Sequence, residues 1–189
     1  MSETLVICDI DGVLANCEHR LKYLRMKDYD TFYGVQMADD SKINAGLSLL
    51  KSLRDSASDS SIIYYATGRP ERTRNLTLNW LEAYLMPQAR SDRLYMRKDV
   101  DYRPSPELKV EQVEQILKDR EVIGGYNLIG WLKAVLAAVT SIITGEKEQP
   151  PTVYFIDDDP ENVKAVCGRF PFITGITFGV KRMEEKDDA

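Results

Sequence analysis

Residues 5–14, LVICDIDGVL, form a short apolar run that ends in two aspartates, Asp9 and Asp11, followed by a glycine. The run is too short for a helix of typical length and is typical of a buried strand in a parallel sheet. Side chains two apart in a strand share a face, so these two carboxylates repel each other unless a cation lies near them. The stretch therefore predicts a strand that delivers two acids to a cation at the edge of a sheet.

The composition is that of a soluble globular protein, since 43% of the 189 residues are hydrophobic and 29% are charged. This length suits one domain with a sizeable core. The net charge of −5 offers no general surface for nucleic acid. Any such contact would come from a local basic patch, for which Arg97, Lys98 and Arg103 are the candidates. The three cysteines lack metal-type spacing and are expected to be reduced, and we expect a cytoplasmic protein.

Apolar runs of strand length alternate with segments of helical period along the rest of the chain. We expect further strands at residues 61–68 (SIIYYATG), 94–96, 153–157 (VYFID) and 173–180, and helices at 43–53, 71–84, 104–118 and around Val163. This alternation predicts an α/β fold, a Rossmann-like, doubly wound parallel sheet with helices on both faces.

We expect a single domain over residues 1–189 with three appended features. Residues 15–40 are polar and aromatic and follow the acidic pair directly, which favours a small cap or lid with one or two short helices. Residues 119–150 form an insert whose apolar tract, 126–144, is expected to be a buried helix, with a membrane span as the alternative. The tail at residues 182–189 is expected to fray. No membrane partner is expected, and the oligomeric state is left open.

Polar side chains end three of the predicted strands. Asp9 and Asp11 end the first, Thr67 ends the second, and residues 157–159, all aspartates, end another. In an open parallel sheet the ligand crevice lies outside the carboxyl ends of the strands, so these side chains should converge on one site. Hard oxygen ligands favour Mg²⁺ when no His or Cys joins them, and the sole histidine, His19, falls in the predicted lid.

Such a site suits phosphoryl transfer through an aspartyl phosphate. Asp9 would attack phosphorus, and Asp11 would protonate the leaving group and then deprotonate the hydrolytic water. Thr67 and the amides near Gly68 would hydrogen-bond phosphoryl oxygens. Lys109, early in the predicted helix 104–118, is the lysine chosen to neutralise developing charge.

Four ordered segments carry a family resemblance: DIDGV at 9–13, ATGR at 66–69, Lys109, and FIDDDPEN at 155–162. They resemble the motifs of the haloacid dehalogenase superfamily of phosphohydrolases. Within it, the chain is similar to the phosphatase domain of bacteriophage-type polynucleotide kinases. That similarity extends to EHRLKYL at 18–24 and DYDTFY at 28–33, and spans most of residues 5–165.

The resemblance implies a Rossmann-like core, Mg²⁺ dependence and the roles given above for Asp9, Asp11, Thr67 and Lys109. It also implies that the metal site contains Asp157 and Asp158 beside Asp9 and Asp11. One departure lies inside the first motif, where relatives commonly have threonine and this chain has Val13. Valine lacks the hydroxyl, so a hydrogen bond that orders the turn would be lost, and we expect weaker activity at most.

We therefore expect a Mg²⁺-dependent phosphomonoesterase that acts on phosphorylated nucleotides or nucleic acid 3′ ends. The alternatives are a small-molecule phosphatase or 5′-nucleotidase of the same superfamily, and a phosphate-binding module without turnover.

Several residues near the motifs allow two interpretations. Gly68, Arg69 and Arg97 are candidates for substrate binding. However, Arg69 could equally form a surface ion pair, and Arg97 could be an ordinary charged surface residue. His19 and Arg20 are expected to be solvated lid residues rather than substrate contacts. Asp159 is expected to cap the helix opened by Pro160.

Overall fold

A computed structural model describes residues 3–56, 61–85, 93–122 and 151–179. Its core is a five-stranded sheet with the strand order β5-β4-β1-β6-β7, and every pair of neighbours is parallel. The strands are β1 (Thr4–Cys8), β4 (Ser61–Pro70), β5 (Leu94–Arg97), β6 (Thr152–Asp157) and β7 (Ile173–Thr177). The predicted parallel α/β fold is confirmed.

The first strand lies at the centre of the sheet. Val6 of β1 pairs with Ile63 of β4 on one side and with Tyr154 of β6 on the other. With strands on both sides and helices on both faces, all five residues of β1 are buried. A continuous apolar sequence is therefore needed here, because no face of this strand meets water.

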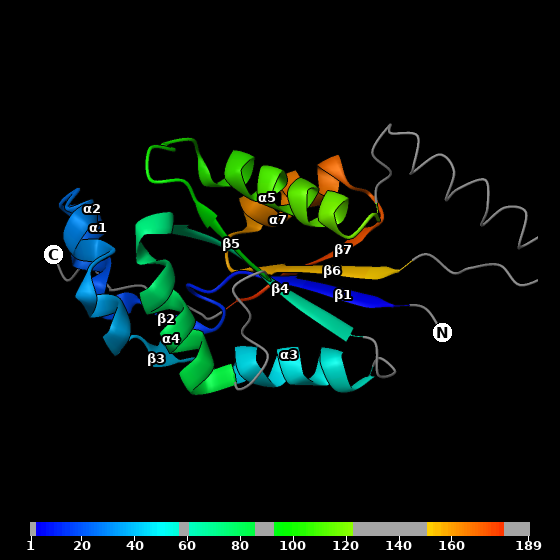
Figure 1. The fold of residues 1–189 in the computed structure, drawn as a ribbon, viewed down its shortest axis with the longest axis horizontal. Helices are drawn as coiled ribbons and strands as arrows, with labels where there is room; N and C mark the ends of the chain where they lie inside the picture. Colours follow the sequence, from blue (N-terminus) through cyan, green and yellow to red (C-terminus); the bar gives the residue numbers. More distant parts are fainter. Residues whose placement is uncertain (1–2, 57–60, 86–92, 123–150, 180–189) are drawn as a thin grey trace, which may run out of the picture.

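Helices cover both faces of the sheet (Figure 1). One face carries α3 (Asn44–Ser56) and α4 (Arg74–Leu85), and the other carries α5 (Ser105–Asp119) and α7 (Pro160–Arg169). Alternate residues of β1 point to opposite faces, which gives two apolar cores. Val6 and Cys8 pack in the core that contains Leu50 of α3 and Leu81 of α4. The other face packs Leu5 and Ile7 against Val113 of α5 and Val166 of α7.

The segment between β1 and α3 forms a small cap. Its two ends are joined where β2 (Ala15–Asn16) pairs antiparallel with β3 (Ser41–Lys42). Between them lie η1 (Glu18–Arg20), α1 (Leu21–Arg25), α2 (Tyr29–Phe32) and η2 (Val35–Asp39). The short helices predicted here are confirmed. Figure 1 shows α1 and α2 at the end of the sheet opposite the N-terminus, where the parallel strands have their carboxyl ends.

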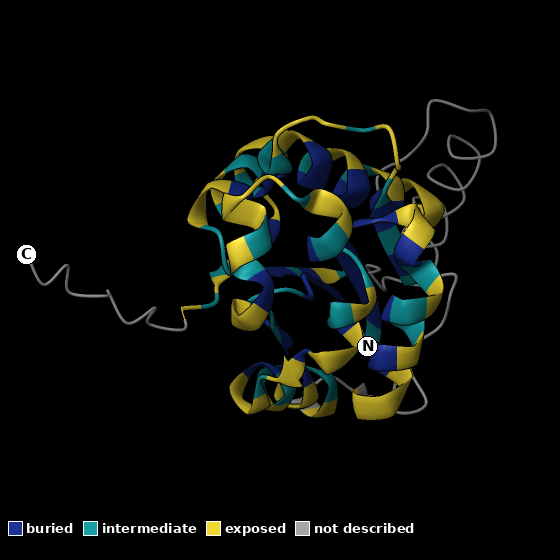
Figure 2. Cartoon of the chain, turned by 90° about the vertical axis from the view of Figure 1, so that its left-hand side faces the viewer, coloured by how far each residue is buried: buried dark blue, intermediate teal, exposed yellow. Residues whose placement is uncertain are grey.

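Figure 2 views the molecule from the side that carries the cap, with exposed residues over the outer helices and loops and buried ones on the strands behind them. A further short helix, η3 (Glu71–Thr73), leads into α4. The predicted helix at 126–144, most of the insert at 119–150 and the tail at 182–189 lie outside the described residues. In the part of the chain that the structure describes, no helix is both long and apolar enough to cross a membrane.

Truncation of a core residue on β6 tests this packing. Phe155 is fully buried in the core beneath α5 and α7. Phe155→Ala should lower the free energy of unfolding by about 3–5 kcal/mol, since it leaves a cavity that the sheet cannot close. Phe172→Ala, at a half-exposed position, is the matched control and should cost less than about 1 kcal/mol. Urea unfolding measures both, and equal losses would contradict the assigned core.

Candidate active site

The ends of three strands bring the predicted residues together. Asp9 follows β1 directly, Thr67 lies near the end of β4, and Asp157 is the last residue of β6. Lys109, on the first turns of α5, reaches over the same edge of the sheet. The fold therefore brings Asp9, Lys109 and Asp157 together, as the sequence predicted. Some contacts of the predicted site residues differ from the prediction.

Lys109 is the centre of this cluster, and its side chain is only 1% exposed. Its Nζ lies 2.8 Å from Asp9 Oδ1 and 3.1 Å from Asp157 Oδ2, and it donates to the carbonyl oxygen of Ala66 at 2.6 Å. Two carboxylate oxygens and one carbonyl oxygen therefore surround this ammonium group. The two carboxylates raise the pKa of Lys109 despite its burial, so the residue stays charged.

Asp9 is held through one of its oxygens. Oδ1 accepts from the backbone N–H of Ile10 at 2.7 Å and from Lys109. Within the described part of the chain, both contacts of this carboxylate fall on Oδ1, which leaves Oδ2 for a metal or a phosphorus atom. Burial raises the pKa of Asp9 to about 8; Lys109 acts in the opposite direction, and nearby Asp157 adds to the rise. Burial therefore favours the neutral form of this carboxyl group, and a further cation beside it would favour the ionised form.

Asp9, Asp157 and Asp158 offer carboxylate oxygens that all lie within 4.8 Å of one another. Three carboxylates and one ammonium, that of Lys109, leave two negative charges, which one divalent cation balances. An all-oxygen set of this kind fits Mg²⁺. Asp157 Oδ1 already accepts from the Asp159 backbone N–H and from Asn162 Nδ2, both at 2.9 Å. Asp9 and Asp158 line an open cavity of about 850 Å³.

Gly12 makes room for Asp158. Its φ is +81°, a left-handed conformation that side chains disfavour, and a Cβ there would lie 2.2 Å from Asp158 Oδ2. The glycine of the first motif therefore lets Asp158 lie against the turn after β1. The turn itself is held by backbone bonds, with the N–H groups of Leu14 and Ala15 donating to Ile10 O at 2.8 Å. Val13 is fully buried in an apolar core, so this turn is ordered without a hydroxyl at position 13.

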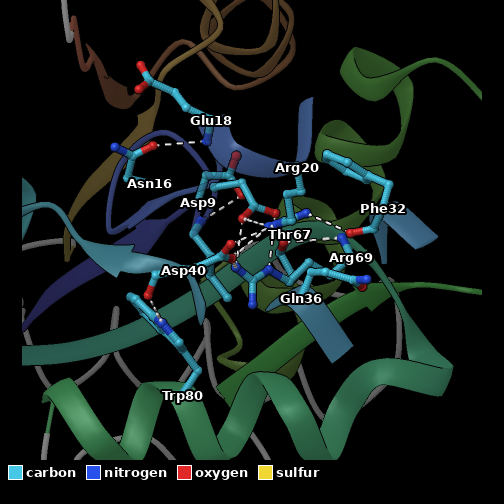
Figure 3. Close-up of polar contacts among 12 residues, drawn as sticks. Asp9, Asn16, Glu18, Arg20, Phe32, Gln36, Asp40, Thr67, Arg69 and Trp80 are labelled. Atoms are coloured by element: carbon cyan, nitrogen blue, oxygen red, sulfur yellow. Dashed lines mark hydrogen bonds and ion pairs between the residues drawn. The ribbon is translucent and has the colours of Figure 1, made fainter. Parts of the chain in front are cut away.

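Asp11 belongs to a different set of charges. Arg69 donates to the Asp11 carboxylate through Nε at 3.1 Å and through Nη2 at 2.7 Å. Arg20 Nη2 donates to the same carboxylate at 2.6 Å. The same two arginines also bind Asp40, at 2.8 Å each. Figure 3 shows Arg20 from the cap and Arg69 from β4 converging on Asp40, whose backbone oxygen accepts from Trp80 Nε1 at 2.7 Å. Two acids and two arginines make this cluster electrically neutral.

This neighbourhood sets the protonation of Asp11. Burial alone would raise the pKa of its carboxyl, but Arg69 and Arg20 outweigh burial and hold the pKa below its ordinary value. Asp11 is therefore ionised in this geometry.

Several expectations for this region need correction. Arg20, expected to be a solvated lid residue, is fully buried because two carboxylates and the Phe32 carbonyl bind it. Arg69 is fully buried in the same cluster, so it is neither a surface ion pair nor placed to touch substrate directly. The Asp11 carboxylate lies outside the group of three metal-compatible acids, because the arginines hold it.

The remaining predicted residues fall in two places. Gly68 lines the cavity with the carboxylates, and a side chain there would meet open space. Thr67 is buried beneath it, and its hydroxyl accepts from the Arg69 backbone N–H at 3.2 Å. Arg97 instead lines a second cavity beside the cap. The predicted cap of α7 is confirmed, since Asp159 accepts from the Glu161 N–H.

Sequence reasoning missed Asp40 altogether. Asp40 ends the cap segment, and nothing in the local sequence ADDSK separates it from the exposed Asp39 beside it. The sequence held only an indirect indication that a second acid is needed. Arg20 and Arg69 lie close to the motifs and need acidic partners if they are buried, and the single charge of Asp11 does not balance both.

No protein-family model and no curated protein matches the chain, whereas solved structures of similar fold do. A chain of the Pnkp1/Rnl/Hen1 complex aligns over 94% of this chain, with a TM-score of 0.58 and 18% identity. The match covers 46% of the chain from the complex, so the present protein spans less than half the length of that chain. The protein tyrosine kinase A (PtkA) of Mycobacterium tuberculosis aligns over 100% of this chain and 90% of its own, with a TM-score of 0.55 and 16% identity.

A class C acid phosphatase from Bacillus anthracis aligns over 88% of this chain and 73% of its own, at a TM-score of 0.44 and 18% identity. At such identities the first two likenesses show the fold. That fold agrees with the one implied by the resemblance of the motifs to the haloacid dehalogenase superfamily.

Neutralising Asp40 should destabilise the protein. Asp40→Asn leaves two buried guanidinium groups with one carboxylate, and we expect a loss of about 3–5 kcal/mol in the free energy of unfolding. Asp39→Asn, at the exposed neighbour, is the control and should change it by less than about 0.5 kcal/mol. Chemical denaturation measures both. An Asp40→Asn protein as stable as the control would show that the cluster does not support the fold.

Filling the space at Gly12 should weaken metal binding. Gly12→Ala places a methyl group against Asp158 and should lower Mg²⁺ affinity by about tenfold or more, as displacement of ligand-supporting groups does elsewhere. Gly168→Ala, where a Cβ meets open space on α7, is the matched control. The readout is calorimetric Mg²⁺ titration of each folded variant. Unchanged affinity in Gly12→Ala would remove Asp158 from the proposed ligands.

Proposed function

We propose that the chain is a Mg²⁺-dependent phosphomonoester hydrolase that forms an aspartyl phosphate on Asp9. The observation that carries this proposal is the setting of Asp9. The side chain borders a cavity, one oxygen is fixed by Lys109 and the Ile10 amide, and the other is free of contacts in the described residues. A carboxylate held in this way is oriented for attack.

In the first step, Asp9 Oδ2 attacks phosphorus and the bond from phosphorus to the ester oxygen breaks. Mg²⁺ held by Asp9 and Asp158, with Asp157 behind them, would offset the repulsion between carboxylate and phosphate. Lys109 supplies a second positive charge at the same oxygens. The proposed phosphate donors are the Gly68 amide and the Thr67 hydroxyl; Gly68 lines the cavity, and Thr67 is buried directly beneath it.

In the second step, water attacks the phosphorus of the aspartyl phosphate, Asp9 leaves as a carboxylate, and Asp11 takes the proton of the water. The lowered pKa of Asp11 keeps its carboxylate unprotonated, so it is available to take this proton. Its earlier role as an acid requires a proton on the same carboxylate. A dianionic phosphate nearby favours that proton, because a like charge raises the pKa of a carboxyl group.

The proposed substrates are phosphorylated nucleotides or nucleic acid 3′ ends. The support is the resemblance of the motifs to the phosphatase domain of bacteriophage-type polynucleotide kinases, together with the shared fold of a chain from the Pnkp1/Rnl/Hen1 complex. A substrate panel tests this choice, with 3′-phosphorylated oligonucleotide, free 3′- and 5′-nucleotides and simple sugar phosphates. Equal rates on all of them would leave a general phosphatase.

Removal of the nucleophile tests the reaction itself. Asp9→Asn should abolish hydrolysis of an aryl phosphate, with at least about a 10⁴-fold loss in kcat, because an amide oxygen does not form the acyl phosphate. Asp55→Asn, at an exposed acid on α3, is the control and should keep wild-type turnover. Chelation should silence the wild type, and added Mg²⁺ should restore it. Turnover retained by a folded Asp9→Asn protein would refute the assignment.

A further inference from the structure

A second cavity lies beside the carboxylates and is unexplained by the chemistry above. Its volume is about 560 Å³, within the range of sites that take one small ligand. One wall comes from the cap around α2, and the other comes from the loop after β5, residues 98–103. Tyr33 lines both this cavity and the one that contains Asp9 and Asp11. The two spaces therefore meet at one aromatic side chain.

Tyr33 is placed between two charged environments. Burial raises the pKa of its hydroxyl, and among the nearby charges Asp11 adds to this rise while Arg97 opposes it. Asp11 lines the first cavity, Arg97 lines the second, and Tyr33 lines both. A group bound in the second cavity would accordingly be a neighbour of a phosphate at Asp9.

The second cavity is rich in charges that cancel one another. Four basic side chains line it and so do four acidic ones: Lys27, Arg72, Arg97 and Arg103, with Asp28, Asp30, Asp99 and Asp101. Most of these groups are paired. Arg72 lies 3.0 Å from Asp30 and 3.8 Å from Asp99, and Arg103 lies 2.6 Å from Asp101.

Arg97 holds the loop that forms one wall of this cavity. Its Nη1 donates to the backbone oxygens of Asp101 at 3.1 Å and Arg103 at 2.7 Å, which fixes the loop. Arg97 and Arg103 of the predicted basic patch both lie near Asp101, and the cavity has as many acidic as basic lining residues, so it offers no excess positive charge for a row of phosphates. Its occupant should carry little net charge.

Aromatic rings supply the rest of the lining. Tyr29 is 52% exposed and Tyr102 is 88% exposed, and both face this cavity together with Tyr33. Other exposed apolar side chains, among them Met26 and Val100, belong to the same two segments. Exposed aromatic rings beside a hollow mark a surface that a planar ligand can cover.

We propose that this tyrosine pocket, formed by Tyr29, Tyr33 and Tyr102, binds the leaving group of the substrate, and that this group is a single nucleoside. The inference rests on the proposed phosphatase function and makes it more specific. A nucleoside is planar, uncharged and rich in hydrogen-bonding groups, which matches rings and balanced charges. The phosphate lies at Asp9, Tyr33 lies at the junction, and the nucleoside stacks in the pocket.

This arrangement predicts how substrates differ. A nucleoside 3′-phosphate should react with a higher kcat/KM than glycerol phosphate, whose aliphatic leaving group stacks on nothing. Lengthening a 3′-phosphorylated strand should add little, because the pocket has no uncompensated basic track for further phosphates. For the same reason, the salt dependence should be shallow and should not steepen with strand length.

The test compares two tyrosine variants on two substrates. Tyr29→Ala and Tyr102→Ala should each lower kcat/KM for a nucleoside 3′-phosphate roughly 5- to 100-fold, mainly through KM, as loss of base stacking does. Both variants should hydrolyse glycerol phosphate at the wild-type rate. Tyr102→Phe should retain nucleotide activity, because the ring remains. Tyr84→Ala, an exposed tyrosine on α4 that lines neither cavity, is the matched control.

Equal losses on both substrates, or no loss on either, would overturn the pocket assignment while the phosphatase itself stands. A kcat/KM that rises steeply with strand length and falls steeply with salt would replace it with a strand-binding track. Binding of a nucleoside 3′-phosphate to the Asp9→Asn protein, measured by calorimetry with and without Tyr102→Ala, tests the pocket independently of turnover. Affinity unchanged by Tyr102→Ala would also overturn the proposal, whereas failure of the wild type on every ester would refute the proposed function.

Discussion

The contact on which the rest of the site depends is the ammonium group of Lys109, buried between Asp9 and Asp157. Its two ion-pair partners and the carbonyl oxygen that accepts from it lie on or directly after β1, β4 and β6, so one side chain connects α5 to three neighbouring strands. A buried carboxylate without such a partner would be protonated, and a buried lysine without carboxylates would lose its proton. The packing of α5 against the sheet and the charged state of Lys109 therefore depend on the same three contacts.

Asp9 and Asp11, the two acids of the first motif, are only two residues apart but form ion pairs with different groups. Asp9 joins a set with two negative charges in excess, which suits a divalent cation. Asp11 joins a neutral set with Arg20, Arg69 and Asp40. Because Arg20 and Asp40 come from the cap, the position of the cap and the protonation of Asp11 are linked. In the proposed mechanism, the carboxylate that gains and loses a proton is thus held by the segment that also borders the cavity.

The strands and helices could be predicted because their apolar periodicity is local, and the site could be placed because parallel strands share a carboxyl edge. Lys109 required the family resemblance, since its position in the sequence alone does not distinguish it from other lysines. Arg20 and Asp40 could not be predicted, because they lie 20 residues apart in a polar segment that has the composition of a solvated surface. Arg69 was misplaced for a similar reason, since its charged neighbours Glu71 and Arg72 are exposed and it alone turns inward.

The central claim is that the phosphoryl group passes through Asp9. The most direct measurement uses the Asp11→Asn protein with Mg²⁺ and an aryl phosphate, whose leaving group needs no general acid, because loss of the base should then let the intermediate accumulate. Acid quenching and borohydride reduction convert an aspartyl phosphate to homoserine, which peptide mapping locates in the sequence. We predict homoserine at position 9, dependent on both Mg²⁺ and substrate. Reduction at another aspartate, or steady turnover with no modified residue at all, would contradict the account.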